Sequence, residues 1–161
     1  MHQNVVSPPN DEELVDAVLG ASRVLVAVAA RSLAEVGEEV TLTQYRSLVV
    51  LASRGPQGVA ALADAVGVTS PTASRMCERL VKKGLVTRRA DRRDRRQVRV
   101  ALSPAGRQLV EGVTGRRRAE LEQLVASIPP ETRAGVVDAL GHLSASAGEV
   151  PEQDWSTGWD L

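Results

Sequence analysis

The sequence is poor in aromatic residues and in cysteine. Three of its 161 residues are aromatic, namely Tyr45, Trp155 and Trp159, and phenylalanine is absent. Proteins that bind single-stranded nucleic acid stack bases on aromatic side chains, so RNA is disfavoured as the main target. Cys77 is the single cysteine, which excludes a disulfide within the chain and agrees with a cytoplasmic location.

Long apolar runs, targeting signals and catalytic signatures are also missing. No stretch approaches the roughly 18 apolar residues of a membrane span, and the first residues lack the pattern of a signal peptide. The chain shows no nucleophile elbow, phosphate-binding loop or paired catalytic carboxylates. His2 and His142 are not part of any group with metal-ligand spacing. We therefore expect no enzyme activity, no cofactor, no metal and no membrane partner.

The formal net charge is zero, with 20 basic and 20 acidic residues, but the charge is unevenly distributed. Residues 75–99 hold eleven basic and three acidic residues, a net charge of +8. The flanking segments, 1–74 and 100–161, carry −4 each. Such segregation is typical of a protein that binds a polyanion. The alternative is a solvated charged face.

Two helical patterns meet just before the arginine-rich stretch. Apolar residues recur at helical spacing over 59–66, and Gly67 then interrupts the pattern. The next pattern covers 70–83, with Ser70 as the expected N-cap and Pro71 at the first helical position. Its inward stripe comprises Ala73, Met76, Cys77, Leu80 and Val81. Two short helices joined by a turn with glycine predict a helix-turn-helix.

The outer face of the second helix carries groups that can read the major groove of DNA. An arginine can form a bidentate pair with guanine, and hydroxyl groups reach bases or phosphates. The candidate contacts are Ser70, Thr72, Ser74, Arg75, Arg79 and Lys82. Cys77, on the opposite face, is interpreted as a small buried core residue rather than as a redox switch.

The arginine-rich stretch predicts a β-hairpin. LVTRRA over 85–90 is extended in character, and QVRVAL over 97–102 alternates, with Val98, Val100 and Leu102 on one face. The loop between them is expected to follow the DNA backbone and to insert an arginine into the minor groove. A guanidinium tolerates the partial desolvation of a groove better than an ammonium. The candidate contacts there are Arg92, Arg93, Asp94, Arg95 and Arg96. The aspartates either order the arginines or merely dilute their charge.

The span from about Leu42 to Gly106 resembles the winged helix-turn-helix of MarR-type bacterial transcription regulators. The resemblance rests on TASR, LVKKGLV, DRRDRR and LSPAG in this order and spacing. Ser103 stands where the family usually has threonine, and either residue can cap a helix. The resemblance implies a homodimer that binds a palindromic operator, usually as a repressor, and often releases DNA on binding a small anionic aromatic compound. By position, it implies that Arg96 enters the minor groove and that Asp94 orients it.

The expected fold class is mainly α (α+β with a small β-hairpin wing): a winged helix-turn-helix whose terminal helices form a dimerisation domain. Thr43 is a candidate cap for a helix that runs to about Arg54, and Pro129-Pro130 separates the last two helices. The terminal helices have more apolar surface than one small lobe can cover, which favours a second copy. The expected segments are a flexible N-terminus (1–10), a dimerisation helix (11–40), the winged domain (41–103), dimerisation helices (104–147) and an acidic tail (148–161).

The function predicted from the sequence is sequence-specific binding of double-stranded DNA by a homodimeric repressor. An effector pocket is expected between the first two helices and the start of the long one, with Tyr45 and Arg46 in its wall. The triplet Arg116–Arg118 either contacts phosphates or belongs to a solvated face or intersubunit ion pairs. Trp155 and Trp159 argue against a purely solvated tail. The alternative function is a protein-interaction module whose basic hairpin docks on an acidic partner.

Overall fold

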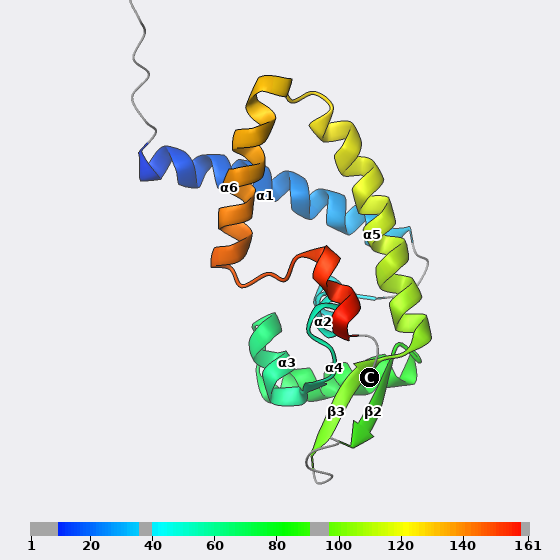
Figure 1. The fold of residues 1–161 in the computed structure, drawn as a ribbon. Helices are drawn as coiled ribbons and strands as arrows, with labels where there is room; N and C mark the ends of the chain where they lie inside the picture. Colours follow the sequence, from blue (N-terminus) through cyan, green and yellow to red (C-terminus); the bar gives the residue numbers. More distant parts are fainter. Residues whose placement is uncertain (1–9, 36–39, 91–96, 159–161) are drawn as a thin grey trace, which may run out of the picture.

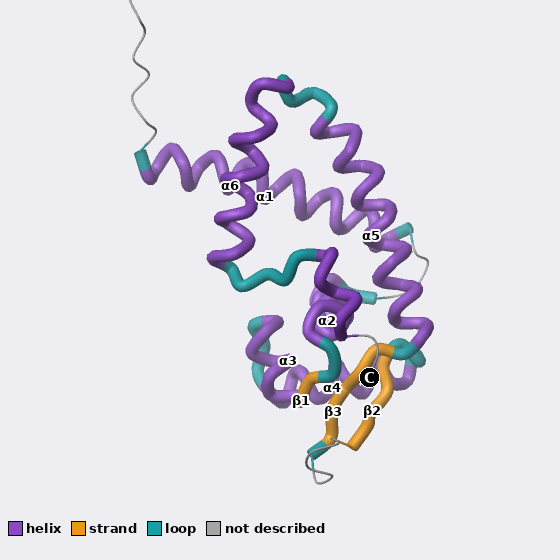
Figure 2. Tube along the Cα trace, viewed as in Figure 1, coloured by secondary structure: helices purple, strands orange, loops and turns teal. Residues whose placement is uncertain are grey.

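The structure is a computed structural model that describes residues 10–35, 40–90 and 97–158. It is mainly helical with one small sheet, as the sequence predicted, and Figures 1 and 2 show a lower lobe with the sheet and an upper arch of long helices. No described helix combines the length and apolar character of a membrane span. The elements are α1 (Asp11–Ala34), α2 (Leu42–Arg54), β1 (Gln57–Gly58), α3 (Val59–Val66), α4 (Ser70–Lys82), β2 (Val86–Ala90), β3 (Val98–Leu102), α5 (Pro104–Val125), η1 (Pro130–Thr132), α6 (Arg133–Ser146) and η2 (Glu152–Gly158).

Helix α2 begins with a capping box. The Thr41 hydroxyl accepts a hydrogen bond from the Gln44 N–H at 3.2 Å, and the Gln44 side chain accepts one from the Thr41 N–H at 3.0 Å. The expected cap at Thr43 is therefore wrong, because the residue pair at 41 and 44 satisfies two backbone donors reciprocally. Asn10 and Glu13 form the same arrangement at the start of α1.

Helix α4 is capped one residue earlier than expected. Thr69 is its N-cap, and Ser70 and Pro71 are its first two residues. Proline is tolerated there because the first N–H groups of a helix have no partner within it. The other end agrees with the sequence: Gly84, just beyond α4, has a φ of +71°, which glycine adopts without strain.

The sheet is antiparallel, with strand order β1-β3-β2. Strands β2 and β3 form the predicted hairpin, with Val86 opposite Leu102 and Ala90 opposite Val98. The two-residue strand β1 pairs with β3 and was not expected. Burial along β3 does not alternate with the faces of the strand: Val98 is 53% exposed, whereas Ala101 is 6% exposed. The hairpin projects from the lobe, so burial follows the distance from the core rather than the face of the strand.

The core lies between α2, α3, α4, the base of the hairpin and the first half of α5. Cys77 is fully buried there, which confirms its interpretation as a core residue. Val81, expected in the inward stripe, is 38% exposed instead. Burial of each large side chain stabilises the fold by about 1.5–3 kcal/mol. The fully buried members include Leu48, Val50, Leu62, Leu80, Leu85, Val86, Val100, Val110 and Val113.

Three elements meet where α5 begins. The Ser103 hydroxyl donates a hydrogen bond to the Gly84 carbonyl at 2.6 Å and accepts one from the Gly106 N–H at 3.0 Å. The Ser103 N–H donates to the Leu85 carbonyl at 3.1 Å. A Cβ at Gly106 would collide with the Leu85 carbonyl oxygen and lie 3.1 Å from Leu102 Cδ2. The start of α5 is thus packed directly on the chain between α4 and β2.

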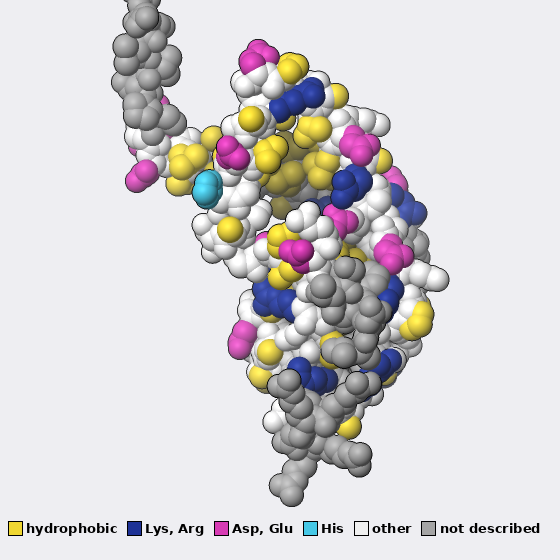
Figure 3. Space-filling model, viewed as in Figure 1, with side chains coloured by type: hydrophobic (Ala, Val, Ile, Leu, Met, Phe, Trp, Pro, Cys, Tyr) yellow, Lys and Arg dark blue, Asp and Glu magenta, His cyan; other side chains and the backbone are white. Residues whose placement is uncertain are grey.

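Helices α1 and α5 pack against each other, and the rest of the upper arch is open. Arg31 Nε lies 2.9 Å from Glu120 Oε1, and Arg116 Nε lies 3.5 Å from Glu35 Oε2. Figure 3 shows hydrophobic side chains in a hollow that α5 and α6 frame. The large hydrophobic residues of α1 that are exposed by more than a third are Leu14, Val15, Val18, Leu19, Val24, Leu25 and Val26.

The backbone contact at Gly106 leads to a stability prediction. We expect Gly106→Ala to lower the free energy of unfolding by about 1–3 kcal/mol, because the new methyl group meets backbone that cannot move aside. Gly115→Ala, in the same helix with open space around its Cβ, is the control and should gain up to about 1 kcal/mol. Urea denaturation checks both variants. A Gly106→Ala protein as stable as the parent would contradict the packing described.

Candidate nucleic-acid interface and adjoining cleft

The outer face of α4 carries a cluster of exposed cations. Ala73, Met76, Cys77 and Leu80 are buried, so the intervening polar residues lie on the opposite side of the helix. The cluster, called here the basic face, comprises Arg75, Arg79, Lys82 and Lys83 at α4, and Arg88 on β2, all exposed. The structure thus brings cations from the helix and from the hairpin to one lobe.

Arg88 connects the two parts of the basic face. Its Nη2 lies 4.0 Å from Oε1 of Glu78, the one acidic residue of α4, so β2 and α4 lie side by side. Both side chains are about half exposed, and an ion pair of this kind contributes little to stability. Its effect is to place an arginine of the strand beside the helix. The sequence prediction omitted Arg88 and Arg89, although both belong to the arginine-rich run.

The remaining predicted contacts divide into two groups. Ser70 and Thr72 are exposed near the start of α4, and the Thr72 hydroxyl lies 3.0 Å from that of Thr69. Ser74 is half-buried. The first turn of α4 holds no acidic residue, so the free N–H groups there can meet a phosphate. The predicted loop contacts, Arg92, Arg93, Asp94, Arg95 and Arg96, lie outside the described residues.

A cleft of about 750 Å³ lies between α2, α5 and the C-terminal segment. Both predicted effector residues, Tyr45 and Arg46, line it. Helix α5 lines this cleft from Thr114 to Val125, further along than the start that the sequence predicted for an effector pocket. Its start is occupied by the junction with α4 and β2. Further lining residues are Ala29, Leu42, Val49, Arg117, Arg118, Leu121, Glu122, Glu149, Glu152 and Trp155.

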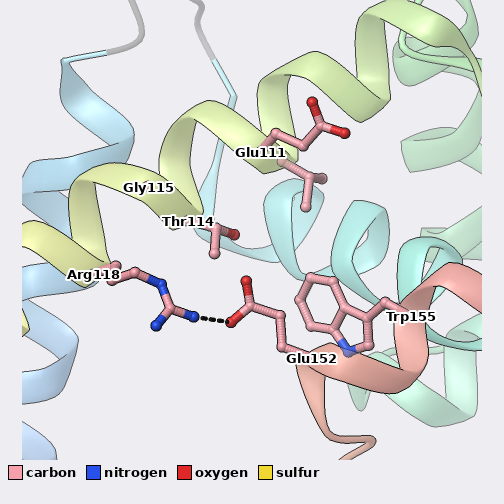
Figure 4. Close-up of a pocket in the computed structure, with 7 residues that line it drawn as sticks. Glu111, Thr114, Gly115, Arg118, Glu152 and Trp155 are labelled. Carbon is pink, nitrogen blue, oxygen red and sulfur yellow. Dashed lines mark hydrogen bonds and ion pairs between the residues drawn. The ribbon is translucent and has the colours of Figure 1, made fainter.

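A smaller cavity of about 350 Å³ adjoins the cleft along α5. Figure 4 shows Arg118 and Glu152 pointing toward each other across it, with Trp155 beside them. Arg118 Nη2 donates a hydrogen bond to Glu152 Oε2 at 3.0 Å. Arg116 pairs with Glu35 on α1. Two arginines of the 116–118 triplet are therefore in ion pairs within the chain, which the sequence reasoning did not anticipate.

Arg46 holds Glu149 by a bidentate pair. Its Nη1 and Nη2 donate to the two carboxylate oxygens at 2.8 and 2.6 Å. These hydrogen bonds lower the pKa of the Glu149 carboxyl below its ordinary value, and the charges of Arg54 and Arg117 act in the same direction. The same hydrogen bonds raise the pKa of Arg46. The cleft therefore has a site for a carboxylate, and the chain's own Glu149 occupies it.

Two further polar groups lie in the wall of the cleft. The Tyr45 hydroxyl is 3.5 Å from Thr114 Oγ1, and the tyrosine side chain is otherwise buried. Arg117 Nε is buried and has no hydrogen-bond partner among the described residues. A buried guanidinium nitrogen without a partner is costly.

The C-terminal segment is ordered against the body of the protein. Trp155 is half-buried and packs against the core, so the tail is not purely solvated at this residue. Its Nε1 donates to the Val150 carbonyl at 3.0 Å, and Arg54 Nη2 donates to the Gly148 carbonyl at 3.2 Å. Trp159 lies outside the described residues. Tryptophan among acidic residues was a weak sequence signal for this docking.

The lowered pKa of Glu149 predicts how the pair depends on pH. Its stabilisation is complete above the ordinary glutamate value of 4.5 and is lost as pH falls through the lowered pKa. We expect Glu149→Gln to cost less than about 1 kcal/mol at neutral pH, because the pair is more than a third exposed. The difference from the parent should shrink below pH 4.5 in denaturation measurements. Glu122→Gln removes another carboxylate from the cleft. If its stability depended on pH in the same way as that of Glu149→Gln, the pH dependence could not be assigned to the Arg46–Glu149 pair.

The described fold and sequence match those of known transcriptional regulators. The MarR family model matches residues 40–98, which contain α2 to β2 and the first residue of β3. The crystal structure of Rv1404 from Mycobacterium tuberculosis is 38% identical, with a TM-score of 0.81, over 90% of this chain and 99% of that one. A structure describing regulation of DNA binding of Bordetella bronchiseptica BpsR by 6-hydroxynicotinic acid is 26% identical, with a TM-score of 0.61, over 86% and 98%.

A curated relative agrees with this assignment. The HTH-type transcriptional regulator YfiV of Bacillus subtilis, itself uncharacterized, is 26% identical over 106 residues. The match covers 66% of each protein, so the chain spans about two thirds of that relative's length. Because the family signature coincides with the winged helix, and because similarity to solved regulators extends through the terminal helices, this chain belongs to the MarR family of transcriptional regulators.

Proposed function

We propose that the protein is a homodimeric repressor that binds double-stranded DNA through its winged helix. The observation that carries this proposal is the basic face, in which exposed cations of α4 and β2 share one surface. Helix α4 would lie in the major groove, with Arg75 and Arg79 toward base edges. The hairpin would follow the backbone, and its loop residues would enter the minor groove.

The upper arch supports the homodimer. Its exposed apolar residues extend over α1, the end of α5 and α6, where Val137 is 69%, Leu140 49% and Leu143 48% exposed. Contiguous apolar surface of this kind marks an interaction site in a protein that is otherwise polar outside. A second copy would cover it and fill the hollow seen in Figure 3. Two-fold symmetry would then set the α4 helices about 34 Å apart, which fits a palindromic operator.

The cleft supports control by a small molecule. It joins α2, which belongs to the winged lobe, to α5 and the C-terminal segment of the upper arch. A ligand there could shift one lobe relative to the other. We propose an aromatic carboxylate as ligand, because three arginines and an apolar wall line the cleft. 6-Hydroxynicotinic acid, described as regulating the DNA binding of BpsR, is an aromatic carboxylic acid of this kind.

The base-reading role of α4 is tested by Arg75→Ala. We expect a loss of about 1–3 kcal/mol in binding of a palindromic promoter fragment, together with relaxed base preference. Lys82→Ala should instead weaken binding to all sequences alike and reduce the slope of affinity against salt by about one. Titration by fluorescence anisotropy at several salt concentrations measures both effects.

Arg133→Ala is the control, because the connection between α5 and α6 lies at the opposite end of the molecule from the sheet. It should leave the affinity for DNA unchanged. Binding that is insensitive to salt, or that survives Arg75→Ala while an acidic protein competes for the same surface, would favour the protein-interaction module instead.

The homodimer is tested by Val137→Glu. A charge placed in a buried apolar interface should raise the dimer dissociation constant about tenfold or more, equivalent to 1.4 kcal/mol or above. Sedimentation velocity over a concentration series measures this change. Ala60→Glu, which adds the same charge at an exposed position of α3, should leave the dimer intact. Equal dissociation constants for the two variants would rule out α6 as part of the interface.

A further inference from the structure

The C-terminal segment supplies the acidic and aromatic groups of the cleft. Glu149, Glu152 and Trp155 line it together with the arginines of α2 and α5. The Glu149 carboxylate is held by two parallel hydrogen bonds from Arg46, at 2.8 and 2.6 Å. This fork geometry is how proteins recognise free carboxylates. The segment therefore presents to the cleft the same chemistry as an aromatic carboxylate, namely an anion beside a ring.

The ion pairs that hold the segment are exchangeable. The side chains of Arg46 and Glu149 are 41% and 36% exposed, and those of Arg118 and Glu152 are 64% and 48% exposed. Each pair thus contributes little alone. The Trp155 indole N–H is satisfied within the segment, by the Val150 carbonyl at 3.0 Å. The segment can leave the cleft without losing that hydrogen bond.

We propose that residues 149–155 act as a tethered ligand of the cleft. Glu149 and Glu152 occupy the carboxylate positions of Arg46 and Arg118, and a free aromatic carboxylate binds by displacing them. This inference concerns regulation of the proposed effector cleft and rests on that part of the proposed function. It does not rest on DNA binding.

Because the segment is tethered to the protein, it sets the concentration of free ligand that is needed to fill the cleft. A linked group acts at an effective concentration in the millimolar range, so it competes even where each contact is weak. The apparent affinity of the free ligand is reduced by the fraction of molecules in which the segment is displaced. Arg117 also lines the cleft, so an incoming carboxylate meets a third guanidinium besides those that the segment occupies.

The test uses the full chain with Trp159→Phe, so that Trp155 is the remaining tryptophan. Glu149→Gln removes the anion that Arg46 holds. Glu122→Gln is the matched control, because it removes a carboxylate of the same cleft that belongs to α5 and not to the segment. Acrylamide quenching of Trp155 fluorescence reports docking, and titration calorimetry with benzoate reports access to the cleft. Trp155 is excited at the long-wavelength edge of the tryptophan absorption band, where benzoate does not absorb.

We expect Glu149→Gln to increase quenching of Trp155, and Glu122→Gln to leave it unchanged. Benzoate should bind the Glu149→Gln chain roughly threefold more tightly than the Glu122→Gln chain, as expected if the displaced fraction rises from about 0.1 to about 0.3. Saturating benzoate should also increase quenching in the parent. This pattern separates displacement of the segment from the general gain that an anion obtains when a negative charge is removed.

Three results would overturn the inference. They are equal quenching in the parent and in Glu149→Gln, equal benzoate affinity in the two variants, and benzoate binding that leaves Trp155 quenching unchanged. If benzoate bound none of the chains, the proposed aromatic carboxylate effector would lose its support. The quenching comparison would still decide whether the Arg46–Glu149 pair holds the segment in the cleft.

Discussion

The arrangement of this protein depends on the close contact between the start of α5 and the chain that joins α4 to β2. Gly106 lies against the Leu85 carbonyl, and Ser103 bonds to the Gly84 carbonyl while it caps α5. Because these contacts involve backbone atoms, they fix orientation more rigidly than side-chain packing would. The recognition helix, the hairpin and the long helix of the upper arch therefore meet at one point. A displacement of α5 would therefore move α4 and the hairpin, which carry the surface proposed to bind DNA.

Charge is organised on two scales in this molecule. Across the chain, a segment of +8 lies between two segments of −4, which leaves the net charge at zero. The attraction to a polyanion is thus concentrated in one segment, and the acidic flanking segments repel a polyanion. Locally, acidic residues of the upper arch and of the C-terminal segment pair with arginines of α2 and α5. These partly exposed pairs add little stability, but they decide which cations are open to a ligand.

Much of the fold followed from local signals in the sequence. The helical spacing of apolar residues and the possible cap at Ser103 indicated elements that the structure contains. The errors also have local causes. Thr41 and Thr43 are both plausible caps, and the reciprocal bond with Gln44 selects Thr41. Strand β1 has two residues, too few for any periodic pattern, and it exists because β3 offers it an edge.

The sequence by itself determined where the positive charge lies and which helix presents it, because burial of the apolar stripe forces the polar residues of α4 outward. The tertiary structure alone decided the character of the cleft. Arg46 and Glu149 are 103 positions apart, and Arg118 and Glu152 are 34 apart, so no spacing rule could pair them. Their meeting depends on the path of the chain through α6, which turns the C-terminal segment back onto α2. Propensity and periodicity act over a few residues, whereas these contacts depend on the packing of whole helices.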